Sequence, residues 1–150
     1  AYAQFHHVSP EAANLSEFYP SFVKPMANFL ARFIDEATHL PRPSYDLWEE
    51  VFLTTTYTTS LTYAALLSSA ELAEAQQDQD SAVRWRAVAG DIAEAAKKYL
   101  YDSSRGTLRK GILSVDGQIT TDDTIDASSF YGAFMYGLFP TDGEELTGKS

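Results

Sequence analysis

The fold is decided by residues 61–73, LTYAALLSSAELA, a run of helix-forming residues that are small on nearly every side. Such a composition is typical of a helix that is buried among other helices. The polar segment 76–80 forms a short connection, and Asp80 or Ser81 would cap the next helix. The apolar residues of that next helix share one face: Trp85, Val88, Ile92, Ala95 and Tyr99. We therefore expect the two helices to form an antiparallel hairpin.

A second helical pattern covers residues 16–37, upstream of this hairpin. Its aromatic residues recur at helical spacing, which is more typical of a core than of a platform for a ligand: Phe18, Phe22, Phe29 and Phe33. Pro25 lies deep enough to kink the helix, and the proline-rich segment 39–43 should end it. Residues 54–59 are rich in β-branched threonine, which favours a strand, but they lead directly into the buried helix and are expected to join it.

The last third of the chain changes pattern twice. The dipeptide Asp116-Gly117 separates two short apolar runs, which predicts a small β-hairpin between Thr107 and Thr121. Asp126 would cap an apolar helix over residues 127–138, and residues 141–145 resemble the opening of one more helix. The whole pattern predicts one all-α domain spanning residues 1–150, built from antiparallel helical hairpins with one small β-hairpin.

Composition excludes several classes of function. The formal net charge is −10, so nucleic acid and anionic membranes would be repelled by the average surface. No apolar run approaches the roughly 20 residues that a bilayer requires, so we expect a soluble chain with no membrane partner. The sequence has no cysteine, hence no disulfide, no thiolate nucleophile and no cysteine-based zinc site. No cofactor is expected, and the compartment stays open.

The densest chemical cluster is YDLWEE, residues 45–50, which lies between two predicted helices. It contains the carboxylates of Asp46, Glu49 and Glu50 and the indole of Trp48. A tryptophan offers a flat apolar face to a sugar ring, and a carboxyl group held near like charges can stay protonated as a general acid. The structural alternative is that adjacent acids form the first turn of a helix and only stabilise its dipole. Composition and spacing alone favour that alternative.

Other polar residues give weaker signals. Adjacent His6 and His7 point apart and make a poor chelate, and His39 has no second ligand at a useful interval, so no metal site is expected. Arg109 and Lys110 would either bind sugar hydroxyls or protect a strand edge by their charge, and the second role is favoured. The sequence contains neither a glycine-rich phosphate loop nor a G-x-S-x-G elbow.

Residues 43–50, PSYDLWEE, resemble the acid-bearing motif of glycoside hydrolase family 15, which includes glucoamylase-like and trehalase-like enzymes. The resemblance extends over most of the chain, with similar order and spacing in residues 40–43, 57–75, 85–87 and 126–129. It implies a partial α/α toroid and inverting hydrolysis of α-glucosidic bonds, with a disaccharide or oligosaccharide of glucose as substrate.

The resemblance also implies the roles of individual residues. Glu49 is expected to be the general acid that protonates the glycosidic oxygen. Glu50 would bind sugar hydroxyls, Trp48 would line the site beside the scissile bond, and Asp46 would help to set the local charge. Residues 51–54 read VFLT where many relatives carry glycine and then histidine or serine, so the adjoining subsite is expected to differ.

The general base is the open part of this prediction. Inversion needs a second carboxylate about 6.5–9.5 Å from the acid, and adjacent side chains of one loop cannot provide it. In the family the base comes from a later segment, so we expect an incomplete barrel whose exposed apolar faces meet further barrel segments or a second copy. Within the chain the candidates are Asp122, Asp123 and Asp126, although Asp126 reads better as a helix cap. The competing class of function is a non-catalytic helical-hairpin module that binds a glycan or a protein.

Overall fold

The computed structural model describes residues 7–8, 14–47 and 50–147. The helical elements are α2 (Leu15–Phe18), the π-helix η1 (Tyr19–Val23), α3 (Lys24–Arg32), α4 (Thr56–Ala75), α5 (Gln79–Tyr99), α6 (Ala127–Met135) and α7 (Glu144–Thr147). The strands are β1 (Ser44–Tyr45), β2 (Phe52–Thr55), β3 (Tyr101–Asp102), β4 (Thr107–Leu108), β5 (Gly111–Val115) and β6 (Gln118–Asp122). None of the described helices combines the length and the apolar character needed to cross a bilayer.

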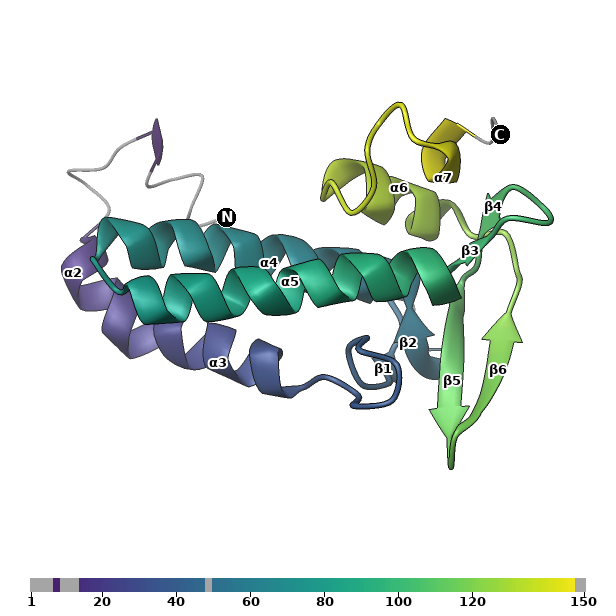
Figure 1. Cartoon of the computed structure of the whole chain (residues 1–150), viewed down its shortest axis with the longest axis horizontal. Helices are drawn as coiled ribbons and strands as arrows, with labels where there is room; N and C mark the ends of the chain where they lie inside the picture. Colours follow the sequence, from purple (N-terminus) through teal and green to yellow (C-terminus); the bar gives the residue numbers. More distant parts are fainter. Residues whose placement is uncertain (1–6, 9–13, 48–49, 148–150) are drawn as a thin grey trace.

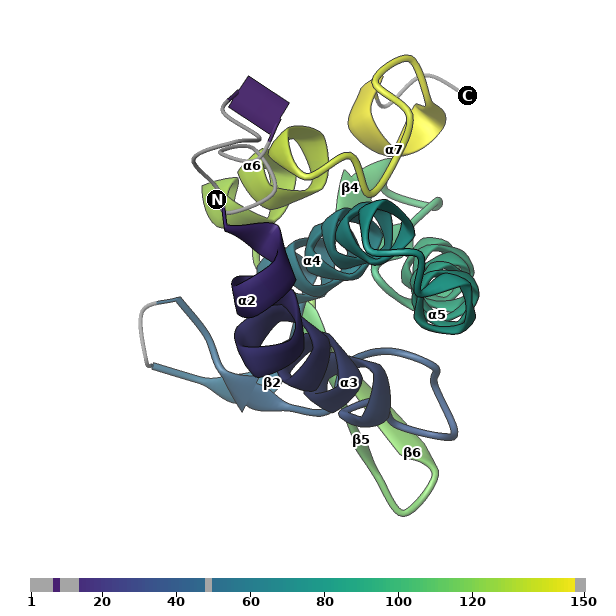
Figure 2. The same cartoon turned by 90° about the vertical axis from the view of Figure 1, so that its left-hand side faces the viewer.

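The expected helical hairpin forms the centre of the molecule. Helices α4 and α5 run antiparallel, with α3 on one side of the pair and α6 on the other (Figures 1 and 2). Small residues bring the two long helices together around fully buried large side chains: Leu66, Trp85 and Ile92. Helix α5 begins two or three residues earlier than expected, because its N-cap is Asp78, whose side chain accepts a hydrogen bond from the Ser81 amide.

The N-terminal helical segment is shorter and less regular than its sequence pattern predicts. A π-helical turn spans Tyr19–Val23, where the Lys24 amide donates to the Tyr19 carbonyl and Pro25, which has no N–H, follows directly. Helix α3 ends at Arg32. The turn that replaces residues 35–37 of the predicted helix is held by the Asp35 carboxylate, which accepts hydrogen bonds from the amide groups of residues 37 and 38.

The buried stripe of this segment also differs from the predicted one. Its core residues are spaced four apart: Leu15, Tyr19, Val23 and Ala27. The aromatic series expected to be core lies beside this stripe, and Phe18, Phe22 and Phe29 are exposed. The apolar stripe predicted from the sequence was broad and included Tyr19 and Val23. The expectation that these phenylalanines are core was wrong, because only the packing against α4 and α5 decides which part of a broad stripe is buried.

The prediction of an all-α toroid fold is wrong, because the chain is a mixed structure with two sheets. An antiparallel sheet has the strand order β1-β2-β5-β6, and β3 pairs separately with β4. Strand β2 comes from the threonine-rich run, which the pattern assigned to a helix and which divides at Thr55 into a strand and α4. Side chains of β-branched residues fit a pleated sheet, and a partner strand was available in β5.

Two local predictions in this region are confirmed. The hairpin at Asp116-Gly117 joins β5 to β6, and both turn residues have the positive φ angles that a type I′ turn requires. Asp126 caps α6, and its carboxylate accepts a hydrogen bond from the Ser128 amide. The hairpin is therefore one edge of a larger sheet, which lies at the end of the helical pair where α4 begins (Figure 1).

An ionic contact fixes the N-terminal segment to the start of α5. The Tyr19 hydroxyl donates to Asp78 Oδ2 over 2.7 Å, and Lys24 Nζ lies 2.7 Å from the same oxygen. These hydrogen bonds hold the pKa of Asp78 well below its ordinary value. The bond from Lys24 has the largest effect, and the bond from Tyr19 has the next largest. Burial and the neighbouring Asp78 raise the pKa of Tyr19. Asp78 thus joins three elements of the chain in its charged form.

Replacing Asp78 with Asn should lower the free energy of unfolding at pH 7 by about 1 kcal/mol, because the ion pair with Lys24 is lost. A carboxylate with a lowered native pKa stabilises the fold above its unfolded pKa of about 3.9 and loses that effect as the pH falls through the native value. Urea titrations should therefore show that the difference in free energy of unfolding between the unchanged chain and Asp78→Asn becomes smaller from pH 5 to pH 2. The matched control is Asp80→Asn on the same helical turn, and a pH-independent difference would contradict the assignment.

Candidate functional site

The motif over residues 45–50 lies in the connection between strands β1 and β2. Ser44 pairs with Leu53 and Tyr45 with Phe52, and the Asp46 amide donates to the Val51 carbonyl over 3.0 Å. The cluster is therefore the end of a β-hairpin, and the first turn of a helix, which was the structural alternative, is excluded for the described part of the motif. Trp48 and Glu49 lie outside the described residues.

Asp46 is the buried anchor of this loop. Its Oδ1 accepts hydrogen bonds from the backbone amides of Glu50, over 2.8 Å, and Val51, over 3.4 Å. Its Oδ2 lies 3.0 Å from Lys110 Nζ, and the exposed fractions of the two side chains are 3% and 13%. One carboxylate therefore closes the loop upon itself and connects it to a cation on another segment.

Electrostatics keep this pair ionised. Burial alone would raise the pKa of Asp46, but the Glu50 amide, the Lys110 ammonium and the Val51 amide together lower that pKa below its ordinary value. The Asp46 carboxylate in turn raises the pKa of Lys110 against the opposing effect of burial. At neutral pH the loop is held by a full negative and a full positive charge.

Lys110 also faces the start of α6. Its Nζ lies 3.8 Å from Oδ2 of Asp126, while the Asp126 carboxylate caps the helix through the Ser128 amide over 2.8 Å. Sequence reasoning treated Lys110 as a solvated strand-edge residue, whereas the structure places its ammonium group between two carboxylates. The sequence signal was a lysine directly before a strand in a strongly acidic chain, but nothing in that signal indicates the direction of the side chain.

Arg109, the neighbour of Lys110, belongs to a separate network. Its guanidinium contacts Asp102 Oδ2 over 3.2 Å and Asp123 Oδ1 over 2.8 Å, and it donates to the Tyr101 carbonyl. Asp122 accepts a hydrogen bond from the Thr124 amide. The three candidates for the general base thus all have local partners: Asp122 in a turn, Asp123 on Arg109, and Asp126 at the α6 cap and near Lys110.

The outer surface of the loop carries polar and aromatic groups. The Glu50 side chain is exposed, although its backbone amide is held by Asp46. The Tyr45 ring is 64% exposed and packs edge-on against Phe52, with ring centroids 5.4 Å apart. A carboxylate beside aromatic rings on a supported loop is a surface that suits a sugar, whose hydroxyl groups and flat faces require both kinds of contact.

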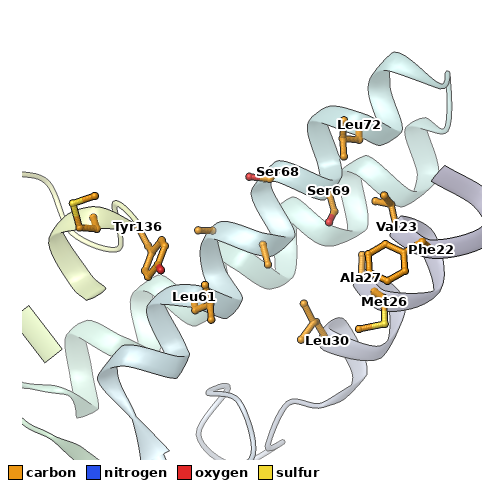
Figure 3. Close-up of a pocket in the computed structure, with 13 residues that line it drawn as sticks. Phe22, Val23, Met26, Ala27, Leu30, Leu61, Ser68, Ser69, Leu72 and Tyr136 are labelled. Carbon is orange, nitrogen blue, oxygen red and sulfur yellow. The ribbon is translucent and has the colours of Figure 1, made fainter. Parts of the chain in front are cut away.

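An apolar groove lies elsewhere on the molecule and is distinct from this loop. Phe22 of η1, Leu30 of α3, Leu61 of α4 and Tyr136 after α6 are among its lining residues, and its volume is about 710 Å³ (Figure 3). Its lining contains no acidic side chain. It therefore offers no carboxyl group for the pair of acids that glycoside hydrolysis ordinarily uses.

No metal site is present among the described residues, since no three histidine or acidic side chains are grouped there. His39 is exposed in a turn at a positive φ of 59°. His7 lies 3.4 Å from Glu71, and both side chains are more than half exposed. His6 lies outside the described residues.

Asp46→Asn should destabilise the fold by about 3 kcal/mol at pH 7, because Lys110 would lose its nearest counter-charge in a buried position. The lowered pKa of Asp46 implies that its stabilising effect is present above the ordinary aspartate pKa and is lost as the pH falls through the native value. Chemical unfolding at pH 7 and pH 3 measures both effects. Asp116→Asn, at an exposed turn, should change neither, and an unchanged stability of Asp46→Asn would refute the anchoring role.

Comparison with known proteins places this site in a family. The family described as glycosyl hydrolases family 15 matches residues 9–150, a span that includes the motif loop, both long helices, Lys110 and Asp126. No curated protein matches the chain. The match agrees with the resemblance of the 43–50 segment and implies a carbohydrate as the class of substrate. Because the family covers nearly the whole sequence, the chain belongs to glycosyl hydrolase family 15.

Proposed function

We propose that this chain carries the general acid of an inverting glycosidase that cleaves α-glucosidic bonds in disaccharides or oligosaccharides of glucose. Glu49 is the acid, Glu50 binds sugar hydroxyls, and Trp48 provides an apolar face beside the scissile bond. Asp46 sets the local charge from beneath the loop. The single observation that carries the proposal is the motif hairpin itself, which is fixed by the buried Asp46 carboxylate directly beside the exposed Glu50.

The proposed reaction uses one protonated and one ionised carboxyl group. Glu49 gives its proton to the glycosidic oxygen as the bond from that oxygen to C1 of the glucosyl unit breaks. A water oxygen bonds to C1 from the opposite face and gives its proton to the base, which inverts the anomeric configuration. The protonated form of Glu49 would be favoured by the neighbouring negative charge of Glu50 in the same loop.

The base must be a carboxylate on the other side of the sugar. Asp122, Asp123 and Asp126 are the candidates within the chain, and each already serves a turn, an ion pair or a helix cap. Recruiting one of them would break those contacts. The proposal therefore favours a carboxylate from another segment or from a second subunit, which approaches the loop across the bound sugar.

A second candidate function is glycan binding without hydrolysis. The observation that favours it is that all three candidate bases are occupied by structural partners, so the described residues offer an acid loop without an evident acceptor for the water proton. In this case Glu50 and the aromatic side chains of the loop hold a sugar, and no bond is cleaved.

Glu49→Gln should reduce glucose release from maltose, maltooligosaccharides or trehalose by at least about 100-fold, because a carboxamide cannot donate the proton. Circular dichroism should show the same helix content as in the unchanged chain. The matched control is Glu50→Gln, which should mainly raise KM because it weakens binding to sugar hydroxyls.

Three outcomes separate the candidates. Full activity of a folded Glu49→Gln variant would refute the assignment of the acid. Glucose release that Glu49→Gln abolishes supports the glycosidase. If the unchanged chain releases no glucose but binds maltose in a calorimetric titration, and Glu50→Gln weakens that binding, the binding module is the correct function of this chain.

A further inference from the structure

We propose that Lys110 is a positioning residue for the acid loop, acting through Asp46 on the backbone that follows Glu49. This inference rests on the proposed function, because it assigns to Lys110 the task of holding the loop that bears the acid. The observation behind it is a continuous set of contacts from the sheet to the loop, in which the Lys110 ammonium group is the central element.

The backbone of Lys110 is fixed on both sides. Its amide donates to the Asp122 carbonyl over 2.9 Å, and its carbonyl accepts from the Thr56 amide over 3.0 Å. The Thr56 hydroxyl also donates to the neighbouring Arg109 carbonyl over 2.7 Å. Lys110 is therefore attached to strand β6 and to the first residue of α4, so its side chain starts from a rigid point.

The Asp46 carboxylate transmits this rigidity to the loop. One of its oxygens meets Lys110 Nζ at 3.0 Å, and the other accepts the Glu50 amide at 2.8 Å. The Glu50 nitrogen belongs to the peptide bond that directly follows Glu49. A shift of the carboxylate therefore moves the backbone next to the proposed acid, and a displacement of about 1 Å at a reacting group can cost roughly 100-fold in rate.

The charge of Lys110 has a second effect on the loop. The loop contains Asp46, Glu49 and Glu50, and the recorded ion pair of Asp46 within the described residues is with Lys110. Without that cation, Asp46 would be left as an uncompensated charge in a buried position of the loop. Arg109 cannot replace it, because its guanidinium is bound to Asp102 and Asp123.

A purely structural role makes a different prediction. Lys110 also lies 3.8 Å from Asp126, so its removal would loosen the start of α6 even if it had no effect on the loop. Such a loss would lower global stability and the amount of folded protein. It would not change the opening of the loop relative to the core.

The test compares Lys110→Met, which keeps the length of the side chain but removes its charge, with Lys110→Arg and with the control Lys98→Met on the exposed surface of α5. Amide hydrogen exchange by NMR reports the loop directly. Lys110→Met should speed exchange at Glu50 by at least about 10-fold while the amides of buried α5 residues stay protected. Lys110→Arg should restore protection, and Lys98→Met should resemble the unchanged chain.

Kinetics of glucose release provide the second readout. Lys110→Met should lower kcat by about 10-fold with little change in KM, and Lys110→Arg should restore kcat. If Lys110→Met does not fold, the double variant Asp46→Asn/Lys110→Met removes both charges. Its Glu50 amide should exchange no more slowly than in Asp46→Asn alone, because the two residues act as a unit.

The outcomes are distinguishable from a failure of the proposed function. Unchanged Glu50 exchange in folded Lys110→Met would overturn the positioning role, as would a kcat of Lys110→Met equal to that of an active unchanged chain. If the unchanged chain releases no glucose, the glycosidase proposal fails. In that case the exchange measurement alone tests whether Lys110 holds the loop. Faster exchange at Glu50 in Lys110→Met supports this role, and unchanged exchange overturns it.

Discussion

The pairing of β2 with β5 at Thr55 and Gly111 is the constraint on which the rest of the structure depends. A Cβ atom at residue 111 would overlap the Leu53 side chain and the Thr54 carbonyl, so the two strands approach this closely because position 111 is glycine. Thr55 is also the N-cap of α4, and its hydroxyl accepts the Thr58 amide. One contact thus sets the start of the central helix, the position of the motif hairpin, and the backbone of Lys110, which immediately precedes Gly111.

Sequence reasoning succeeded where neighbouring residues determine a structural feature. The α4–α5 pair, the Asp116-Gly117 turn and the Asp126 cap each follow from local composition. It failed where a segment far away in the sequence determines the structure of a residue run. The threonine run before α4 carries no local sign that β5 will pair with it, so the sheet was missed and an all-α fold was expected. For the same reason, Phe18, Phe22 and Phe29 were expected in the core of the N-terminal helices, although they are exposed.

The candidate site was likewise predicted from the sequence only in part. The acid motif was found from its resemblance to glycoside hydrolase family 15, and the family match bears out that membership. Asp46 was predicted to set the local charge and Lys110 to protect a strand edge, but their contact was not predicted, because a buried Asp46 and an inward Lys110 have the same letters as solvated ones. The buried residues differ from solvated ones in their contacts: the Glu50 amide and the Lys110 ammonium group, which come from separate segments, both meet the Asp46 carboxylate. The described part of the motif loop is thus held by an ion pair that only the tertiary structure reveals.

The most direct measurement of this account is a titration of the Asp46 carboxyl carbon by NMR. The central claim is that Asp46 is ionised and bound on both oxygens, by the Glu50 amide on one side and by Lys110 on the other. A titration midpoint below the ordinary aspartate value of about 3.9, which moves upward in Lys110→Met, is the result that the account predicts. A midpoint at or above that ordinary value, unaffected by loss of the Lys110 charge, would contradict it.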